Sequence, residues 1–303
     1  MKRKIIQMAG KTMVVSLPYD WVRKYNVHKG DEVNLEANRN TIEISLGKTA
    51  EPEKTLTLET GKGFTMLHRL IGAAYKAGYS SVEIAYHSPE EYGAIEKCLK
   101  RTLIGFEVIQ KTSSRVVVKL LSKLDSNDFD NVLRRCFMSL LAMAEESLEH
   151  INKGNFDGLK EIVAMDDNIN RYSDFCRRVL NTTDVLNYKR LQPLYYIVEQ
   201  LERIGDEYRD IASYLIDHKF RPSSEIKEAY SEVNSYLRMF YKLFYEFNID
   251  GLEYFGERRP VIEAMINKGL NKAKPGEMRV LHRLSKVFEA IFDMNGTIMT
   301  LFL

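Results

Sequence analysis

Cysteine is scarce in this 303-residue sequence, and long apolar runs are absent. The three cysteines, Cys98, Cys136 and Cys176, are far apart and odd in number, which indicates a reducing compartment without a disulfide framework or a paired-cysteine metal motif. No apolar run approaches the roughly 18 residues that a membrane span needs. The amino-terminal MKRKIIQMAGK lacks the apolar core of a signal peptide. We therefore expect a cytoplasmic protein without membrane insertion.

Neither sign of charge is in excess. The 44 basic and 42 acidic residues give a net charge of +2, so any electrostatic argument about partners must be local. The hydrophobic fraction of 45% is sufficient for a globular core. The length predicts two or three domains.

Three segments that differ in their predicted secondary structure indicate an α+β multidomain fold. Residues 1–47 contain short strands and one brief helix, which Asn26 ends in a left-handed conformation. Residues 54–123 alternate in the order β-α-β-α-β-β and predict a small α/β domain of unknown role. Residues 125–303 predict an all-α bundle.

Helical periodicity divides the last segment into two groups of three helices with similar order and length. We therefore expect a duplicated three-helix unit, with repeats at 125–220 and 223–303. The six predicted helices lie near 127–152, 156–180, 188–218, 223–248, 250–270 and 277–302.

The amino-terminal segment is too small to bury much surface alone, so a second copy is expected to complete its sheet. Residues 1–46 contain eight basic and five acidic residues. Lys11 comes just before a predicted strand, and Arg23 and Lys24 lie on the short helix, where they are suited to phosphate contacts. The alternative is a small domain that only dimerises.

The stretch GKTMVVSLPYDWVRKYNVHKGDEVNLEANRNTIEI resembles the AbrB/SpoVT swapped-hairpin domain. The resemblance rests on the glycine before the first strand, on SLP, on the amphipathic DWVRKY, on GDEV and on the closing hairpin. It implies an interlocked homodimer whose basic residues contact DNA. Carried over by position, the contact residues are Lys11, Arg23, Lys24, Arg3 and Lys4.

A row of acids, Glu202, Asp206 and Asp210, recurs every four residues on the predicted third helix, where like charges repel. The second helix carries a matching row at Asp166, Asn170 and Asp174. Ordinary surface pairs, Glu199–Arg203 and Asp206–Arg209, explain the first row simply. Alternatively, a cation is bound by oxygen ligands from both helices, as in many helical bundles.

LERIGDEYRDIA resembles the signature of the PhoU family, and IVAMDDNIN resembles its companion helix. The resemblance implies two three-helix repeats, metal on the acidic faces, and regulation of phosphate uptake with a transporter and its sensor. Asn170 stands where the family usually has Asp, and LHRLSKVFEAIFDM lacks a second acidic row, so at most one site per chain is expected. The implied ligands of this Fe, Mg, Mn or Zn ion are Asp166, Asn170, Glu202, Asp206 and Asp210.

An AbrB-like domain followed by a PhoU-like bundle resembles the archaeal phosphate uptake regulators. The resemblance implies a dimeric, phosphate-responsive transcription regulator with transporter or sensor components as further partners. The main alternative is a PhoU-type adaptor whose amino-terminal domain only dimerises. No base stands beside a plausible nucleophile, so we expect no enzyme. A bundle metallohydrolase and an antitoxin are the remaining alternatives.

Overall fold

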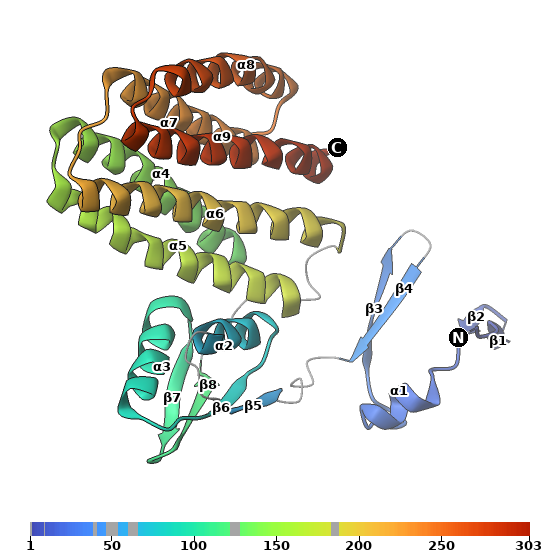
Figure 1. Ribbon diagram of the computed structural model, residues 1–303. Coiled ribbons are helices and arrows are strands. Elements are labelled where there is room, and N and C mark those ends of the chain that lie inside the picture. Colours follow the sequence, from blue (N-terminus) through green and yellow to red (C-terminus); the bar gives the residue numbers. More distant parts are fainter. Residues whose placement is uncertain are drawn as a thin grey trace. The chain divides into compact units, whose positions relative to one another are not determined.

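The computed structural model describes residues 2–8, 10–38, 41–46, 54–59, 66–121, 128–182 and 188–303. The chain divides into two compact units, residues 1–53 and 54–303 (Figure 1). The predicted second and third domains therefore share one unit. No helix in the described ranges combines the length and apolarity needed to cross a lipid bilayer.

The first unit contains two antiparallel hairpins and a short helix. β1 (Ile6–Met8) pairs with β2 (Thr12–Val14), and β3 (Val33–Asn38) pairs with β4 (Thr41–Leu46). Between the hairpins lies α1 (Tyr19–Lys24). Asn26 follows α1 with a φ of 51°, which confirms its predicted left-handed conformation.

Apolar side chains of these hairpins stay exposed. The exposed fractions are 54% for Ile6, 62% for Met13, 64% for Leu35 and 70% for Ile42. No described side chain of the unit is fully buried, and its two described sheets are not bonded to each other. Within the described residues, one copy of this unit therefore has no hydrophobic core of its own.

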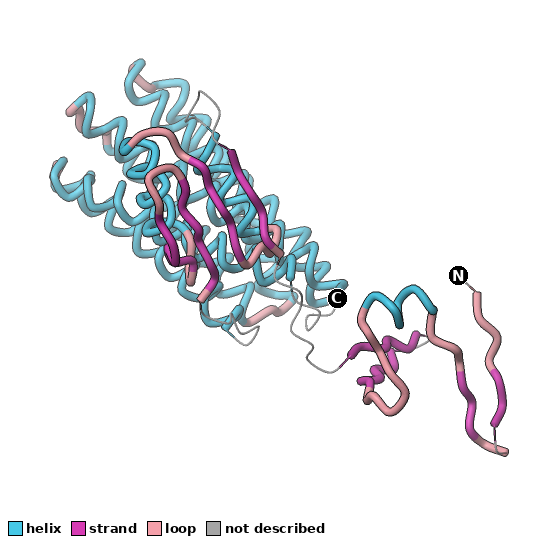
Figure 2. The backbone as a smooth tube through the Cα atoms, turned by 90° about the horizontal axis from the view of Figure 1, so that it is seen from below, coloured by secondary structure: helices cyan, strands magenta, loops and turns pink. Residues whose placement is uncertain are grey.

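The second unit begins with an open sheet, one face of which lies against helices (Figure 2). The strand order is β5-β6-β8-β7, with β5 parallel to β6 and the other neighbours antiparallel. The element order along the chain agrees with the prediction. The elements are β5 (Thr55–Glu59), α2 (Leu67–Lys76), β6 (Ser81–Ala85), α3 (Pro89–Thr102), β7 (Phe106–Lys111) and β8 (Arg115–Leu120).

Among the described residues, six long helices follow the sheet, and their positions confirm the six predicted helices. The first three have 25, 27 and 31 residues and the last three have 22, 24 and 28. The predicted duplication of a three-helix unit stays a prediction. They are α4 (Phe129–Lys153), α5 (Phe156–Thr182), α6 (Tyr188–His218), α7 (Ser224–Tyr245), α8 (Ile249–Lys272) and α9 (Pro275–Phe302).

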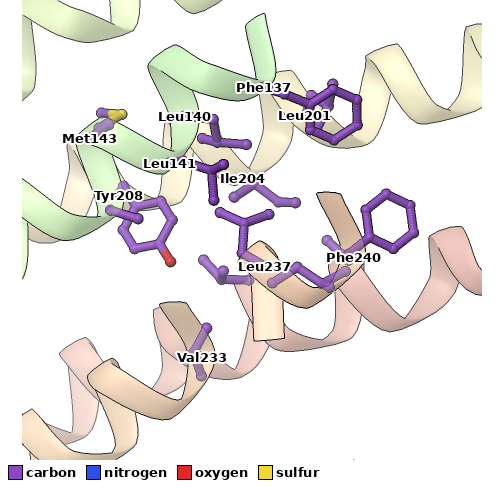
Figure 3. Close-up of a cluster of buried hydrophobic side chains, with 14 of the residues drawn as sticks. Phe137, Leu140, Leu141, Met143, Leu201, Ile204, Tyr208, Val233, Leu237 and Phe240 are labelled. Atoms are coloured by element: carbon purple, nitrogen blue, oxygen red, sulfur yellow. The ribbon is translucent and has the colours of Figure 1, made fainter. Parts of the chain in front are cut away.

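The two groups of helices share one core. Figure 3 shows Phe137 and Leu140 of α4 converging with Leu201 of α6 and Leu237 of α7. Burying each such side chain contributes about 1.5–3 kcal/mol. Because α7 belongs to the second group and packs on α4 and α6, neither group buries its apolar surface alone.

A buried arginine of α5 joins the helical bundle to the sheet domain. The helical bundle consists of α4 to α9, and the sheet domain consists of β5 to β8 with α2 and α3. Arg178 Nη1 donates to the carbonyl oxygens of Tyr75 (2.5 Å) and Tyr79 (2.9 Å) at the carboxyl end of α2. The guanidinium also lies over the Tyr75 ring, 4.9 Å from its centroid. Asn181 Nδ2 donates to the Lys76 carbonyl at 2.9 Å. Burial lowers the pKa of Arg178, and these acceptors at a helix carboxyl end are suited to a cation.

Replacing Arg178 by Gln is expected to lower the free energy of unfolding by about 2–3 kcal/mol, because buried carbonyls lose their donor. Urea unfolding monitored by circular dichroism measures the change. Arg171→Gln, an exposed position on the same helix, is the control and should change stability by less than about 0.5 kcal/mol. Equal losses in both variants would show that the junction does not depend on Arg178.

Candidate functional site

The predicted acid rows lie along the seam between α5 and α6. Asp166 faces Arg209, Ser173 faces Glu202, and Arg177 faces Glu199, so positions rise on one helix as they fall on the other. The two helices are therefore antiparallel neighbours (Figure 1). Exposure differs along the rows, since the Asp166 side chain is 7% exposed and the Asp206 side chain is 43% exposed.

Arg209 gathers three of the predicted carboxylates. Its Nη1 lies 2.9 Å from Asp166 Oδ2 and also contacts Asp206, while Nη2 lies 2.9 Å from Asp210 Oδ1. Burial by itself lowers the pKa of this arginine, but its interactions with Asp166, Asp210 and Asp206 raise it overall. Arg209 is therefore firmly cationic where the acid row is densest.

Asp166 is the most buried acid of the row. Its Oδ2 accepts hydrogen bonds from Arg209 and from Asn170 Nδ2, each at 2.9 Å. Its Oδ1 is buried and has no hydrogen-bond partner among the described residues. Burial raises the pKa of Asp166, and Arg209 opposes that rise.

A second cluster forms around Arg177, whose side chain is 4% exposed. Its Nε lies 3.0 Å from Glu199 Oε1, its Nη1 lies 3.4 Å from Asp174, and its Nη2 contacts Glu202. Ser173 Oγ also donates to Glu202 at 3.2 Å. Glu202 is thus held apart from the Arg209 cluster.

The sheet domain and the last helix both extend this network. Lys76 of α2 lies 3.0 Å from Asp174. Arg283 of α9 contacts Glu207 at 2.7 Å and Asp210 at 2.6 Å. Arg283 was not predicted from the sequence. The one feature of the sequence near Arg283 that could have indicated this contact is the second basic residue three positions later, Lys286. Both side chains contact Glu207, so they lie on the same face of α9.

Of the two simple surface pairs, one is present and one is not. Asp206 pairs with Arg209 as expected. The Glu199–Arg203 pair is wrong, because Glu199 contacts Arg177 of the neighbouring helix instead. A projection of one helix contains no information about side chains from another helix. Arg177 of α5 forms the ion pair with Glu199 that the projection assigned to Arg203.

The five predicted metal ligands do not converge on one point. Asp166, Asp206 and Asp210 surround Arg209, Asn170 is bonded to Asp166, and Glu202 belongs to Arg177. Across the described part of the chain, no group of three Asp, Glu, His or Cys side chains is placed to hold a metal. The oxygen donors and the unpartnered Asp166 Oδ1 suit a hard cation, but the guanidinium stands among them, so as arranged they do not fit one. The metal ion stays a prediction.

A cleft of about 300 Å³ opens beside this network between α6 and α9. Arg279 lies over the Tyr214 ring at 4.8 Å, and Arg283 forms part of the same wall. Two guanidinium groups and a serine hydroxyl are donors that an oxyanion can use. The lining residues are Asp210, Ser213, Tyr214, Asp217, His218, Arg279 and Arg283.

The predicted DNA-contact residues Lys11, Arg23, Lys24, Arg3 and Lys4 are all exposed. None of them forms an ion pair with a described residue, although Lys24 lies 5.2 Å from the centroid of the Tyr25 ring. Arg23 and Lys24 share the last turn of α1. Their charges are therefore not compensated within the described part of the unit.

Residues 133–215 match the PhoU domain family. The match begins in α4, includes all of α5, and ends in α6, so it contains both acid rows and both arginine clusters. It supports a PhoU family protein and a role in the regulation of phosphate homeostasis. Comparison with curated proteins and with solved structures gave no match.

Replacing Arg177 by Met is expected to destabilise the protein by about 3–5 kcal/mol, because three carboxylates lose their buried counter-ion. Adding Glu202→Gln should recover part of this loss, with a coupling energy of about 1–3 kcal/mol. Urea unfolding of the two single variants and the double variant measures the coupling.

The exposed Lys153–Glu149 pair of α4 is the control cycle, with side chains 65% and 57% exposed. Its coupling energy should stay below about 0.5 kcal/mol. A coupling between Arg177 and Glu202 as small as this would contradict their role as a buried ion pair.

Proposed function

We propose that the chain is a phosphate-responsive transcription regulator that binds DNA as a homodimer. The PhoU domain match to residues 133–215 carries the phosphate part of the proposal. The first unit, which resembles the AbrB/SpoVT domain, binds the DNA. The helical bundle of the second unit responds to phosphate, to a metal ion or to a transporter or sensor component. The proposal places the protein in the cytoplasm and assigns it no catalytic step.

Uncompensated basic side chains support the DNA-binding part. Lys11, Arg23 and Lys24 are exposed and lack acidic partners among the described residues. Phosphate contacts dominate DNA affinity, and lysine and arginine supply them. Arg3 and Lys4 lie just before β1 and add to the same charge.

Exposed apolar strands support the homodimer. Ile6, Met13, Leu35 and Ile42 are each more than half exposed in a single copy. A unit that exposes this much apolar surface gains stability when a second copy covers it. The same observation favours the second candidate function, an adaptor on a phosphate transporter whose first unit serves only for dimerisation.

The cleft between α6 and α9 supports a direct response to phosphate. Arg279 makes no ion pair with any described residue, and Arg283 stands on the same wall with its charge shared between two acids. An inorganic phosphate placed there would meet guanidinium donors, which bind oxyanions in a bidentate manner.

DNA binding separates the two candidate functions. The wild-type protein should retard its own promoter DNA at low salt, and its affinity should fall steeply as salt rises. Lys11→Ala, Arg23→Ala and Lys24→Ala should each weaken binding and reduce the slope of log K against log [salt] by roughly 0.9 for each lost phosphate contact. Lys268→Ala, an exposed position on α8, should have no effect. If the wild type causes no retardation at low salt, the adaptor function is favoured.

The dimer has its own test. Light scattering should give twice the 35.2 kDa mass of one chain. Leu35→Asp and Ile42→Asp together should produce monomers, because two charges would be buried in an apolar interface. Met278→Asp, 48% exposed on α9, should leave the dimer intact. A wild-type monomer at micromolar concentration would contradict the proposed assembly.

A further inference from the structure

The cleft between α6 and α9 has two walls of different chemistry. On α6 the lining includes Asp210, Ser213, Tyr214 and Asp217, and on α9 it consists of Arg279 and Arg283. Residues three, four or seven positions apart lie on one face of a helix. Oxygen groups of one helix therefore share a cleft of about 300 Å³ with guanidinium groups of the other.

The guanidinium wall keeps donors that the chain itself does not use. Arg279 forms no ion pair with a described residue, and its guanidinium lies over the Tyr214 ring, 4.8 Å from the centroid. Arg283 contacts Glu207 and Asp210 through one nitrogen, Nη1. Its Nε has no hydrogen-bond partner among the described residues. Guanidinium donors of this kind are suited to an oxyanion, and above all to a phosphate.

The oxygen wall keeps acceptors in the same way. Both carboxylate oxygens of Asp210 are already paired with guanidinium groups. Asp217 is exposed and forms no ion pair within the described ranges. The hydroxyls of Ser213 and Tyr214 form no hydrogen bond with a described residue. One carboxylate and two hydroxyls are therefore available to a ligand that donates hydrogen bonds.

An inorganic phosphate would satisfy only the guanidinium wall. Phosphate oxygens are chiefly acceptors, so Asp217 repels the ion and gains little from it. The cleft volume of about 300 Å³ also reaches the range of about 300–1,000 Å³ that is usual for sites of small organic ligands. A ligand that satisfies both walls has a phosphate at one end and hydrogen-bond donors at the other.

We propose that this cleft binds a small phosphate monoester whose organic part carries hydroxyl groups. The phosphate lies against Arg279 and Arg283, and the hydroxyls donate to Asp217 and exchange hydrogen bonds with Ser213 and Tyr214. Sugar phosphates and nucleoside monophosphates both belong to this class. The inference rests on the part of the proposed function in which this cleft responds to phosphate, and it names the class of phosphate compound. It does not depend on DNA binding by the first unit.

Calorimetric titration of the full chain with glucose 6-phosphate, methyl phosphate and inorganic phosphate tests the proposal. Methyl phosphate is the matched control, because it is a monoester without hydroxyl groups. Glucose 6-phosphate should bind at least about tenfold more tightly than either of the others, because its hydroxyls add hydrogen bonds, one of them to a charged acceptor. Glucose itself should not bind measurably, because it lacks the phosphate. AMP, titrated in parallel, distinguishes a nucleotide from a sugar phosphate as the source of the ligand.

Two variants separate the two walls. Arg279→Gln should weaken the binding of every phosphate compound about tenfold, because each loses a charged donor. Asp217→Ala should weaken the hydroxyl-bearing ester about tenfold and leave methyl phosphate unchanged or more tightly bound, because an acceptor and a repelling charge are lost together. A variant that merely disturbed the fold would weaken both compounds. Arg203→Gln and Glu253→Ala, at exposed positions outside the cleft, should leave every affinity at the wild-type value.

Two results would overturn the proposal. One is that neither glucose 6-phosphate nor AMP binds more tightly than methyl phosphate, and the other is that Asp217→Ala weakens all compounds equally. Equal binding of inorganic phosphate and the esters would contradict this inference alone and leave a direct response to inorganic phosphate in place. Tight binding of a hydroxyl-bearing ester without binding of inorganic phosphate would support the inference and count against that direct response.

Discussion

A buried guanidinium needs acceptors, and this requirement determines how α5 lies against its neighbours. Arg177 and Arg178 are adjacent on that helix, and each side chain is almost fully buried. Arg177 contacts carboxylates of α6, while Arg178 contacts carbonyl oxygens of α2. An unpaired buried charge costs several kcal/mol. The two consecutive arginines therefore hold α5 to the bundle on one side and to the sheet domain on the other.

The two groups of three helices differ in charge where they meet. In the first group, α6 presents the carboxylates of Glu207 and Asp210, and in the second, α9 presents Arg283 and Lys286. The third helices of the two groups thus attract each other across the bundle. A duplicated unit that kept acids in both copies would instead place like charges at this contact. The single acidic row therefore contributes to assembly of the bundle as well as to the site.

Much of the fold could be predicted from the sequence because its signals are local. Helical periodicity located all six long helices, and Ser88 caps α3 through a hydrogen bond from the Glu91 amide. β1 and β2 have three residues each, which is too short a run to show alternation.

The acidic row of the site could also be found from the sequence, since it repeats every four residues along α6. Its partners could not. Arg177 reaches Glu199 from another helix, and Arg283 reaches Asp210 from a helix more than 70 positions away in the chain. Periodicity describes one helix at a time, so the choice among competing cations depends on packing that only the folded chain provides.

The hydrogen bonds from Arg178 and Asn181 to the end of α2 have a consequence for synthesis of the chain. The sheet domain leaves the ribosome before α5 does, so the carbonyl groups of Lys76 and Tyr79 lack their donors from α5 until residues 178–181 arrive. The carboxyl end of α2 in the sheet domain therefore gains these hydrogen bonds only after α5 has been synthesised. The nascent chain reaches its stable arrangement only after a large part of the bundle has been made.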